Sequence, residues 1–139
     1  MKRFVLLAVS VPLVGILFCP MVMAAPSMPS DLQMVQPDPS LPKELSGFWG
    51  KWEGQSSVMQ YFLIIEKIDK ENASVYLWRS GWGTLPSGWE RIEAKVSKEY
   101  GKYILWFVGP AGVTEVTFKG DNLYIDTRPY GSIPLKRVR

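Results

Sequence analysis

Residues 89–128 read WERIEAKVSKEYGKYILWFVGPAGVTEVTFKGDNLYIDTR, and this stretch decides the fold. Within Trp89–Glu99, the apolar residues Ile92, Ala94 and Val96 alternate with polar ones, which is the period of a half-buried strand. The segments that follow also have strand character and lie at Gly101–Gly109, Val113–Lys119 and Leu123–Arg128. Because only short turns separate them, consecutive strands are expected to pair antiparallel, as a meander.

Four more strand segments flank this stretch, at Gly47–Gly54, Met59–Asp69, Ala73–Arg79 and Ser132–Val138. Turns such as Gly120-Asp121-Asn122 use residues that tolerate positive φ. The sequence therefore predicts an all-β domain over residues 45–139. We expect an eight-stranded antiparallel up-and-down barrel, because closure removes exposed strand edges. A two-sheet sandwich is the alternative. Bulky residues in Met59–Ile68 and Tyr103–Val108 predict a filled barrel.

The N-terminus has the features of an export signal. Lys2 and Arg3 precede the apolar stretch Phe4–Phe18, and Val22-Met23-Ala24 offers a cleavage site. We expect residues 1–24 to be a signal peptide and the protein to be exported, periplasmic or secreted. An uncleaved membrane anchor is the alternative. Lipidation at Cys19 is less favoured, because bulky Phe18 precedes that cysteine.

Residues 25–44 are rich in proline and polar residues and have no apolar period. Such a composition buries too little surface to offset the entropy of ordering, so we expect a disordered, extended linker. A docking peptide is the alternative.

Composition excludes several functions. The chain has no histidine, and its one cysteine, Cys19, lies in the leader. Ser-His-Asp and Cys-His nucleophilic sites and His/Cys metal sites are therefore excluded. Two of the 16 basic residues, Lys2 and Arg3, lie in the leader, which leaves 14 against 13 acidic residues. Only Lys136–Arg139 is locally basic, so we expect no nucleic-acid partner.

Gly47-Phe48-Trp49 resembles the G-x-W signature that opens the first strand in calycins, the group of lipocalins, fatty-acid-binding proteins and avidins. The resemblance implies a meander barrel with a ligand mouth at one end. It also implies a late basic residue near the first-strand Trp, here Lys136, Arg137 or Arg139. The motifs LSGFWGKW (45–52), VYLW (75–78) and GWERI (88–92) are similar to small lipocalin-like modules of exported bacterial proteins.

The candidate ligand-binding residues surround the Gly-rich segment Ser80–Gly88. They are three tryptophans, which offer flat apolar faces, and two arginines, which can bond an acidic or hydroxylated group: Trp78, Arg79, Trp82, Trp89 and Arg91. The structural alternative is that these tryptophans pack in the core or cap the barrel end.

We expect no catalysis, because most candidate carboxylates occupy alternating positions typical of a solvated outer face: Glu53, Glu66, Glu90, Glu93 and Glu115. We expect no cofactor and no metal. The sequence thus predicts an exported, non-catalytic binding module whose Trp rim takes a small apolar or glycan ligand. The alternative is a protein-interaction or inhibitor barrel that uses the same rim and the N-terminal arm. The sequence leaves the oligomeric state open, and a membrane is expected only through an uncleaved leader.

Overall fold

The computed structural model describes residues 26–81, 83–84 and 86–139. The predicted signal peptide lies outside them. One short helix precedes eight strands: α1 (Lys43–Ser46), β1 (Gly50–Gln55), β2 (Gln60–Ile68), β3 (Asn72–Arg79), β4 (Gly88–Glu99), β5 (Lys102–Gly109), β6 (Gly112–Lys119), β7 (Asn122–Thr127) and β8 (Gly131–Arg137).

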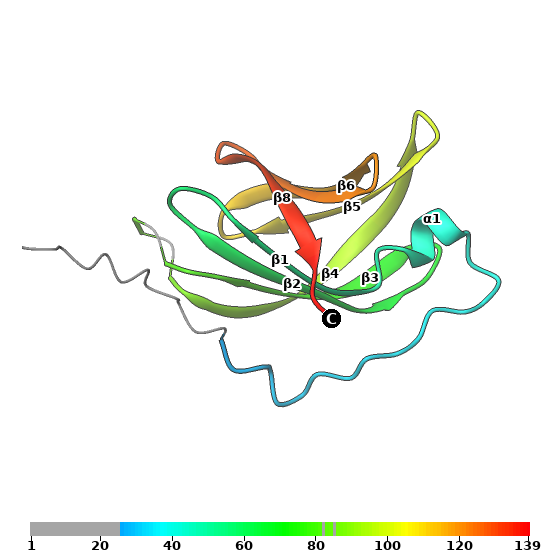
Figure 1. Cartoon of the computed structure of the whole chain (residues 1–139), viewed down its shortest axis with the longest axis horizontal. Coiled ribbons are helices and arrows are strands. Elements are labelled where there is room, and N and C mark those ends of the chain that lie inside the picture. The colour runs from blue at the N-terminus through cyan, green and yellow to red at the C-terminus, as the bar shows by residue number, and fades with distance from the viewer. Residues whose placement is uncertain (1–25, 82, 85) are drawn as a thin grey trace, which may run out of the picture.

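The strands form a closed barrel in which each pairs antiparallel with the next along the chain and β8 pairs with β1 (Figure 1). The predicted up-and-down barrel is confirmed, and the sandwich is not formed. The predicted inner face of β4 is also confirmed, since Ile92 and Ala94 are in the core while Arg91 and Glu93 are exposed.

The interior is filled by alternate residues of the strands, as the bulky strand residues predict. Among the innermost are Leu63, Ile65, Leu105, Val116 and Leu123, each at most 1% exposed. Side chains of this size removed from water supply the main favourable contribution to folding.

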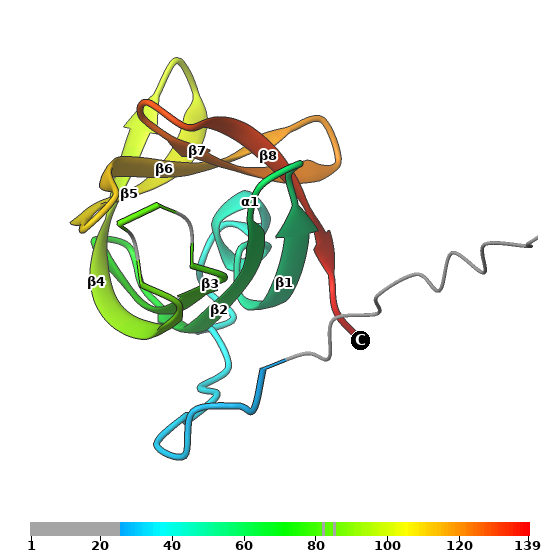
Figure 2. The same cartoon turned by 90° about the vertical axis from the view of Figure 1, so that its left-hand side faces the viewer.

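One end of the barrel is closed by the segment before β1. Helix α1 lies across the far end of the barrel in Figure 2, and Leu45 and Phe48 are fully buried there. The Phe48 ring meets the Phe118 ring edge to face at 4.8 Å. The first strand was expected to start at Gly47, but it starts at Gly50, because α1 and the turn after it take up the preceding residues.

Arg137 links β8 to the segment before β1 at this closed end. Its guanidinium donates to the carbonyl oxygens of Trp49 (2.9 Å) and Gly47 (2.7 Å) and lies 4.3 Å from the centre of the Trp52 ring. Gly50 has a φ of +126°, which side-chain-bearing residues rarely adopt, and a Cβ there would also displace the Arg137 guanidinium, 2.7 Å away, so the position favours glycine. Of the three basic residues considered from sequence, Arg137 makes these contacts, and the ring beneath it is that of Trp52 rather than Trp49.

Two neighbouring pairs of strands, β4–β5 and β1–β8, are paired only near this closed end, and we call these two boundaries the seams of the barrel. Pairing of β4 with β5 stops at Lys95 and Trp106, and β1 pairs with β8 through Trp52 and Glu53 alone. At the opposite end, which we call the open end, the barrel therefore divides into a first half (β1–β4) and a second half (β5–β8), one above the other in Figure 1.

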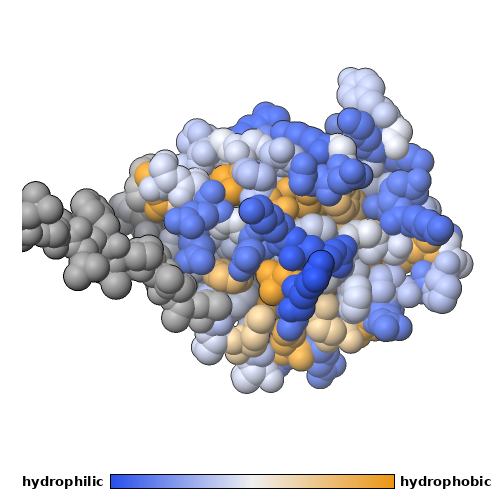
Figure 3. All heavy atoms as spheres, in the orientation of Figure 1, coloured by the Kyte–Doolittle hydropathy of each residue, from blue (hydrophilic) through white to orange (hydrophobic). Residues whose placement is uncertain are grey.

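The N-terminal arm, residues 26–41, contains no helix or strand, and it runs along the outer side of β2 and β3 from the open end to α1 (Figures 1 and 2). Under it, β2 and β3 are buried on both faces: outward-facing Phe62, Ile64 and Tyr76 are buried as well as their inward-facing neighbours. On the face seen in Figure 3, apolar side chains form separate patches among hydrophilic ones.

No helix among the described residues is both long and apolar enough to cross a membrane.

Candidate functional site

The open end gathers the loops that a ligand would meet first. They are the β1–β2 hairpin, the Gly-rich loop after β3, the β5–β6 turn and the β7–β8 turn (Figure 2). Four of the five predicted site residues lie near this end, on β3 and β4. Trp82 lies outside the described residues.

Because successive side chains of a strand point to opposite faces, these four residues do not all lie on the same face of the sheet. Trp78 and Trp89 are cross-strand partners on the outer face, and Arg91 stands opposite Tyr76 on the same face. Arg79 points the other way, into the barrel, where only 5% of it is exposed. The alternation of Val75, Leu77 and Arg79 in the sequence carries this information, because it puts Arg79 on the core face.

The outer group is a chain of aromatic and charged contacts. The Trp78 ring meets the Phe62 ring edge to face at 5.6 Å, and the Trp89 ring meets that of Tyr76 at 6.4 Å. The Arg91 guanidinium lies 5.5 Å from the centre of the Tyr76 ring. Both tryptophans are half-buried, so they offer a ligand less ring surface than the fully exposed rim predicted from the sequence.

Arg79 is the most unusual group of the inner face. Its Nη1 donates to Glu90 Oε2 at 3.3 Å, and its buried Nε has no partner among the described residues. An arginine carries five N–H donors, and leaving a buried one unpaired costs free energy. Burial also raises the pKa of the neighbouring Tyr61 phenol, although the positive charge of Arg79 opposes that shift. The inner face at this end thus offers donors to a group that can accept them.

Access to Arg79 lies along the unpaired part of the β4–β5 seam. A hollow of about 180 Å³ there is lined by Arg79, Pro86, Ser87, Gly88, Trp89, Glu90 and Pro110. Across the seam, a Cβ on Gly109 would lie 3.8 Å from Glu90 Oε2. Pro110 of the β5–β6 turn lines the hollow together with residues of β3 and β4, so elements of both halves meet there. Elsewhere in the second half, the buried hydroxyls of Thr114 and Thr127 lie 3.1 Å apart.

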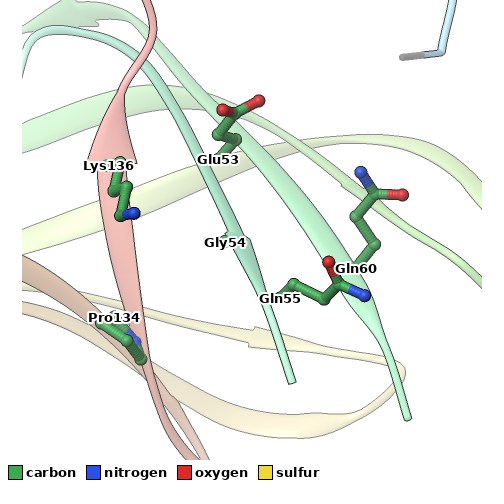
Figure 4. A pocket seen from close by; sticks show the side chains of 6 residues that line it. All are labelled: Glu53, Gly54, Gln55, Gln60, Pro134 and Lys136. Atoms are coloured by element: carbon green, nitrogen blue, oxygen red, sulfur yellow. The ribbon is translucent and has the colours of Figure 1, made fainter. Parts of the chain in front are cut away.

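The seam between β1 and β8 also has an unpaired part, because β8 contains a proline. Two positions after Glu53 and Lys136, the β1–β8 ladder would put Gln55 opposite Pro134, and proline has no N–H to donate. A hollow of about 430 Å³ lies outside this break (Figure 4), lined by Glu53, Gly54, Gln55, Gln60, Pro134 and Lys136. Four of its six lining residues have polar side chains, and Gln60 Oε1 is buried without a partner among the described residues.

Two carboxylates differ from the sequence prediction of a solvated outer face. Glu90 faces inward to Arg79, and Glu66 faces outward but is only 3% exposed. Glu66 accepts from Arg91 Nη2 at 2.7 Å and from the Gln33 backbone N–H at 3.1 Å. The prediction was wrong for Glu66 because the arm covers it. No pattern local to Glu66 in the sequence signals that contact.

In the part of the chain that the structure describes, no group of three or more acidic residues is placed to hold a metal ion. The open end offers hydrogen-bond donors, charged groups and aromatic faces. Comparison of the chain with known protein families, with curated proteins and with solved structures finds no match in any of the three.

Proposed function

We propose that this protein is an exported, non-catalytic binding module whose open barrel end takes a small apolar or glycan ligand. One observation carries the proposal: Arg79 is buried inside a mainly apolar barrel, and its Nε–H has no partner among the described residues. A ligand carbonyl, carboxylate or hydroxyl oxygen beside Arg79 would satisfy that donor, and binding sites typically combine apolar walls with a few such polar groups.

The open seams support this site. Ligand entry between β4 and β5 would separate strands that are already unpaired there, so no backbone hydrogen bond of the barrel would have to break. The Gly-rich loop after β3 borders the same hollow, and Trp82 in this loop stays the predicted aromatic contact. Export rests on the sequence of residues 1–24.

We also propose that the barrel is related to the calycins. Supporting this are the closed antiparallel meander, the barrel end closed at α1 and the Arg137 guanidinium over the Trp52 ring. Gly50-Lys51-Trp52 repeats the G-x-W spacing at the position where the strand actually begins. A ligand bound at the end opposite α1 would agree with the relationship.

The test is a calorimetric titration of the protein with glycans, fatty acids and biotin-like heterocyclic acids. We expect saturable binding by one of these classes. Arg79→Met keeps the length of the side chain but removes its donors, and should weaken binding about tenfold or more, the effect of losing a charged hydrogen bond. Arg139→Met is the matched control, because Arg139 is exposed and follows β8 at the closed end, away from Arg79.

Trp82→Ala should also weaken binding while leaving thermal unfolding unchanged. Binding that is indifferent to both Arg79→Met and Trp82→Ala would show that the ligand sits elsewhere. Absence of binding across all classes, from a cooperatively folded protein, would overturn the small-ligand function.

A further inference from the structure

The arm attaches to the first half at two places. Near its start, Trp89 Nε1 donates to the Ser27 carbonyl oxygen at 2.8 Å. Farther along, the backbone N–H groups of Gln33 and Val35 both donate to Glu66, to Oε2 at 3.1 Å and to the carbonyl oxygen at 2.8 Å. The segment from Ser27 to Val35 is thereby held along the outer face of β2–β4.

Glu66 can receive the arm because it sits at an irregularity of the sheet. The register between β2 and β3 shifts between Ile65 and Lys67, so Glu66 has no partner on β3. Its carbonyl oxygen accepts from Val35 N and from Trp49 Nε1, the latter at 3.2 Å. Its carboxylate is fixed by Arg91 at 2.7 Å. The barrel thus presents a fixed pair of acceptors, one charged and one neutral, to whatever lies over them.

What the arm contributes to these bonds is backbone. Ser27 supplies a carbonyl oxygen, while Gln33 and Val35 supply N–H groups two residues apart, the spacing at which an extended chain presents groups on one side. Backbone contacts of this kind give affinity with little dependence on sequence. An extended segment from another chain could therefore make the same three bonds.

A polar hollow lies beside the arm on the outer face of the sheet. It has a volume of about 470 Å³, with Gln33 and Val35 on one side and Glu66, Asn72, Ser74 and Arg91 among the residues on the other. The lining is polar, so side chains that enter this space would be polar as well.

We propose that the outer face of β2–β4 is a docking surface for an extended peptide segment that bonds Glu66 and Trp89 through its backbone and places polar side chains over the hollow beside Glu66. The arm occupies this surface in cis, and a partner segment binds by replacing it. The surface lies outside the barrel and Arg79 inside it, so this interaction differs from the small-ligand site at the open end, and Trp89 is the residue that borders both.

The experiment uses the full chain with a protease recognition sequence inserted between Pro39 and Ser40, which are both exposed. The protein is folded intact and then cut, so the arm remains only through its own contacts. A fluorescent peptide of residues 26–39 is added, and binding is followed by anisotropy, with a scrambled peptide beside it. We expect saturable exchange of the peptide into the cut protein and at least tenfold weaker binding to the uncut protein, where the tethered arm competes.

Two variants test the contacts. Trp89→Phe removes the indole donor but keeps a ring beside Tyr76, and Glu66→Gln removes the charge but keeps the carbonyl oxygen. We expect the peptide to bind the cut protein about fivefold and about tenfold more weakly, respectively, as the loss of a neutral and a charged bond implies. Trp106→Phe, on the exposed face of β5, is the control and should bind like the parent.

If the scrambled peptide binds as tightly as the arm peptide, and both variants weaken the binding of each peptide, the result still supports recognition through the backbone. Peptide binding that is unaffected by both variants would overturn the proposal, and so would the absence of saturable binding to a cut protein that still unfolds cooperatively. Either result would leave the small-ligand site untouched, since Arg79→Met and Trp82→Ala report on that site alone.

Discussion

The two halves of the barrel share one core but differ on their outer faces. In the first half, β2 and β3 are buried on both sides, and Ile64 on the outer face is only 1% exposed. In the second half, burial alternates along the strands, and outward Val108 and Trp106 are 66% and 41% exposed. The arm lies along the first half and supplies the difference. The outer face of a sheet can therefore be as buried as its inner face when another segment of the same chain covers it.

The largest expected effect comes from apolar outward positions in the two halves. Ile64→Ala should lower the free energy of unfolding by about 2–4 kcal/mol, because a buried side chain is removed. Val108→Ala should change it by less than about 0.5 kcal/mol, because that side chain is already in water. Urea unfolding of both variants measures the contrast, and equal effects would mean that the first half is not covered in solution.

The second prediction compares carboxylates. Glu66→Ala should cost about 1–3 kcal/mol, since the Gln33 N–H loses its acceptor and Arg91 loses the buried carboxylate that it pairs with. Glu115→Ala, in the second half, removes only an exposed pair with Arg128 at 3.9 Å and should cost less than about 0.5 kcal/mol. Thermal unfolding gives both values. Amide hydrogen exchange at Val35 should rise in Glu66→Ala alone, and unchanged protection there would contradict the anchoring role of Glu66.

The third prediction concerns the contact that joins the halves at the closed end. Arg137 on β8 donates to two carbonyl oxygens before β1, so Arg137→Met should lower stability by about 1–2 kcal/mol. Arg139→Met, two residues later and exposed, is the matched control. Calorimetric unfolding distinguishes them. If both variants unfold like the parent, Arg137 contributes nothing to closure of the barrel.

The smallest expected effect is pH-dependent and lies in a turn of the first half. The backbone N–H groups of Glu71 and Asn72 donate to Asp69 and hold the pKa of its carboxyl below the usual value. Because the folded pKa is lowered, this stabilisation is present above about pH 4, the unfolded pKa, and is lost as pH falls through the folded value.

Asp69→Asn should therefore cost less than about 1 kcal/mol at pH 7 for this solvent-exposed turn, and the difference from the parent should shrink toward pH 3. Urea unfolding at both pH values measures it. Asp121→Asn, in the β6–β7 turn of the second half, is the matched control. A difference that grows on acidification would have the wrong sign for this mechanism.

Much of the fold follows from local pattern. The alternation Ile92, Ala94, Val96 gives the strand and its inner face, and short turns rich in Gly, Asn and Asp give the meander. Closure follows from the cost of exposed edges. The same alternation could have placed Arg79 inside, whereas grouping it with Trp78 as one rim relied on nearness in sequence. Neighbours on a strand point to opposite faces, so nearness along the chain does not define a site.

By itself, the sequence determined the strands, their order and the absence of histidine and cysteine chemistry from the barrel domain, because these depend on residue type and short-range period. Tertiary structure alone decided that the proline-rich arm runs along β2 and β3, that Glu66 anchors it and that Arg79 is buried with an unpaired donor. Those facts depend on contacts between residues as much as 62 positions apart, such as Ser27 and Trp89. Such long-range contacts leave no period in the chain, since each is fixed by how the closed barrel places distant backbone groups in reach of one another.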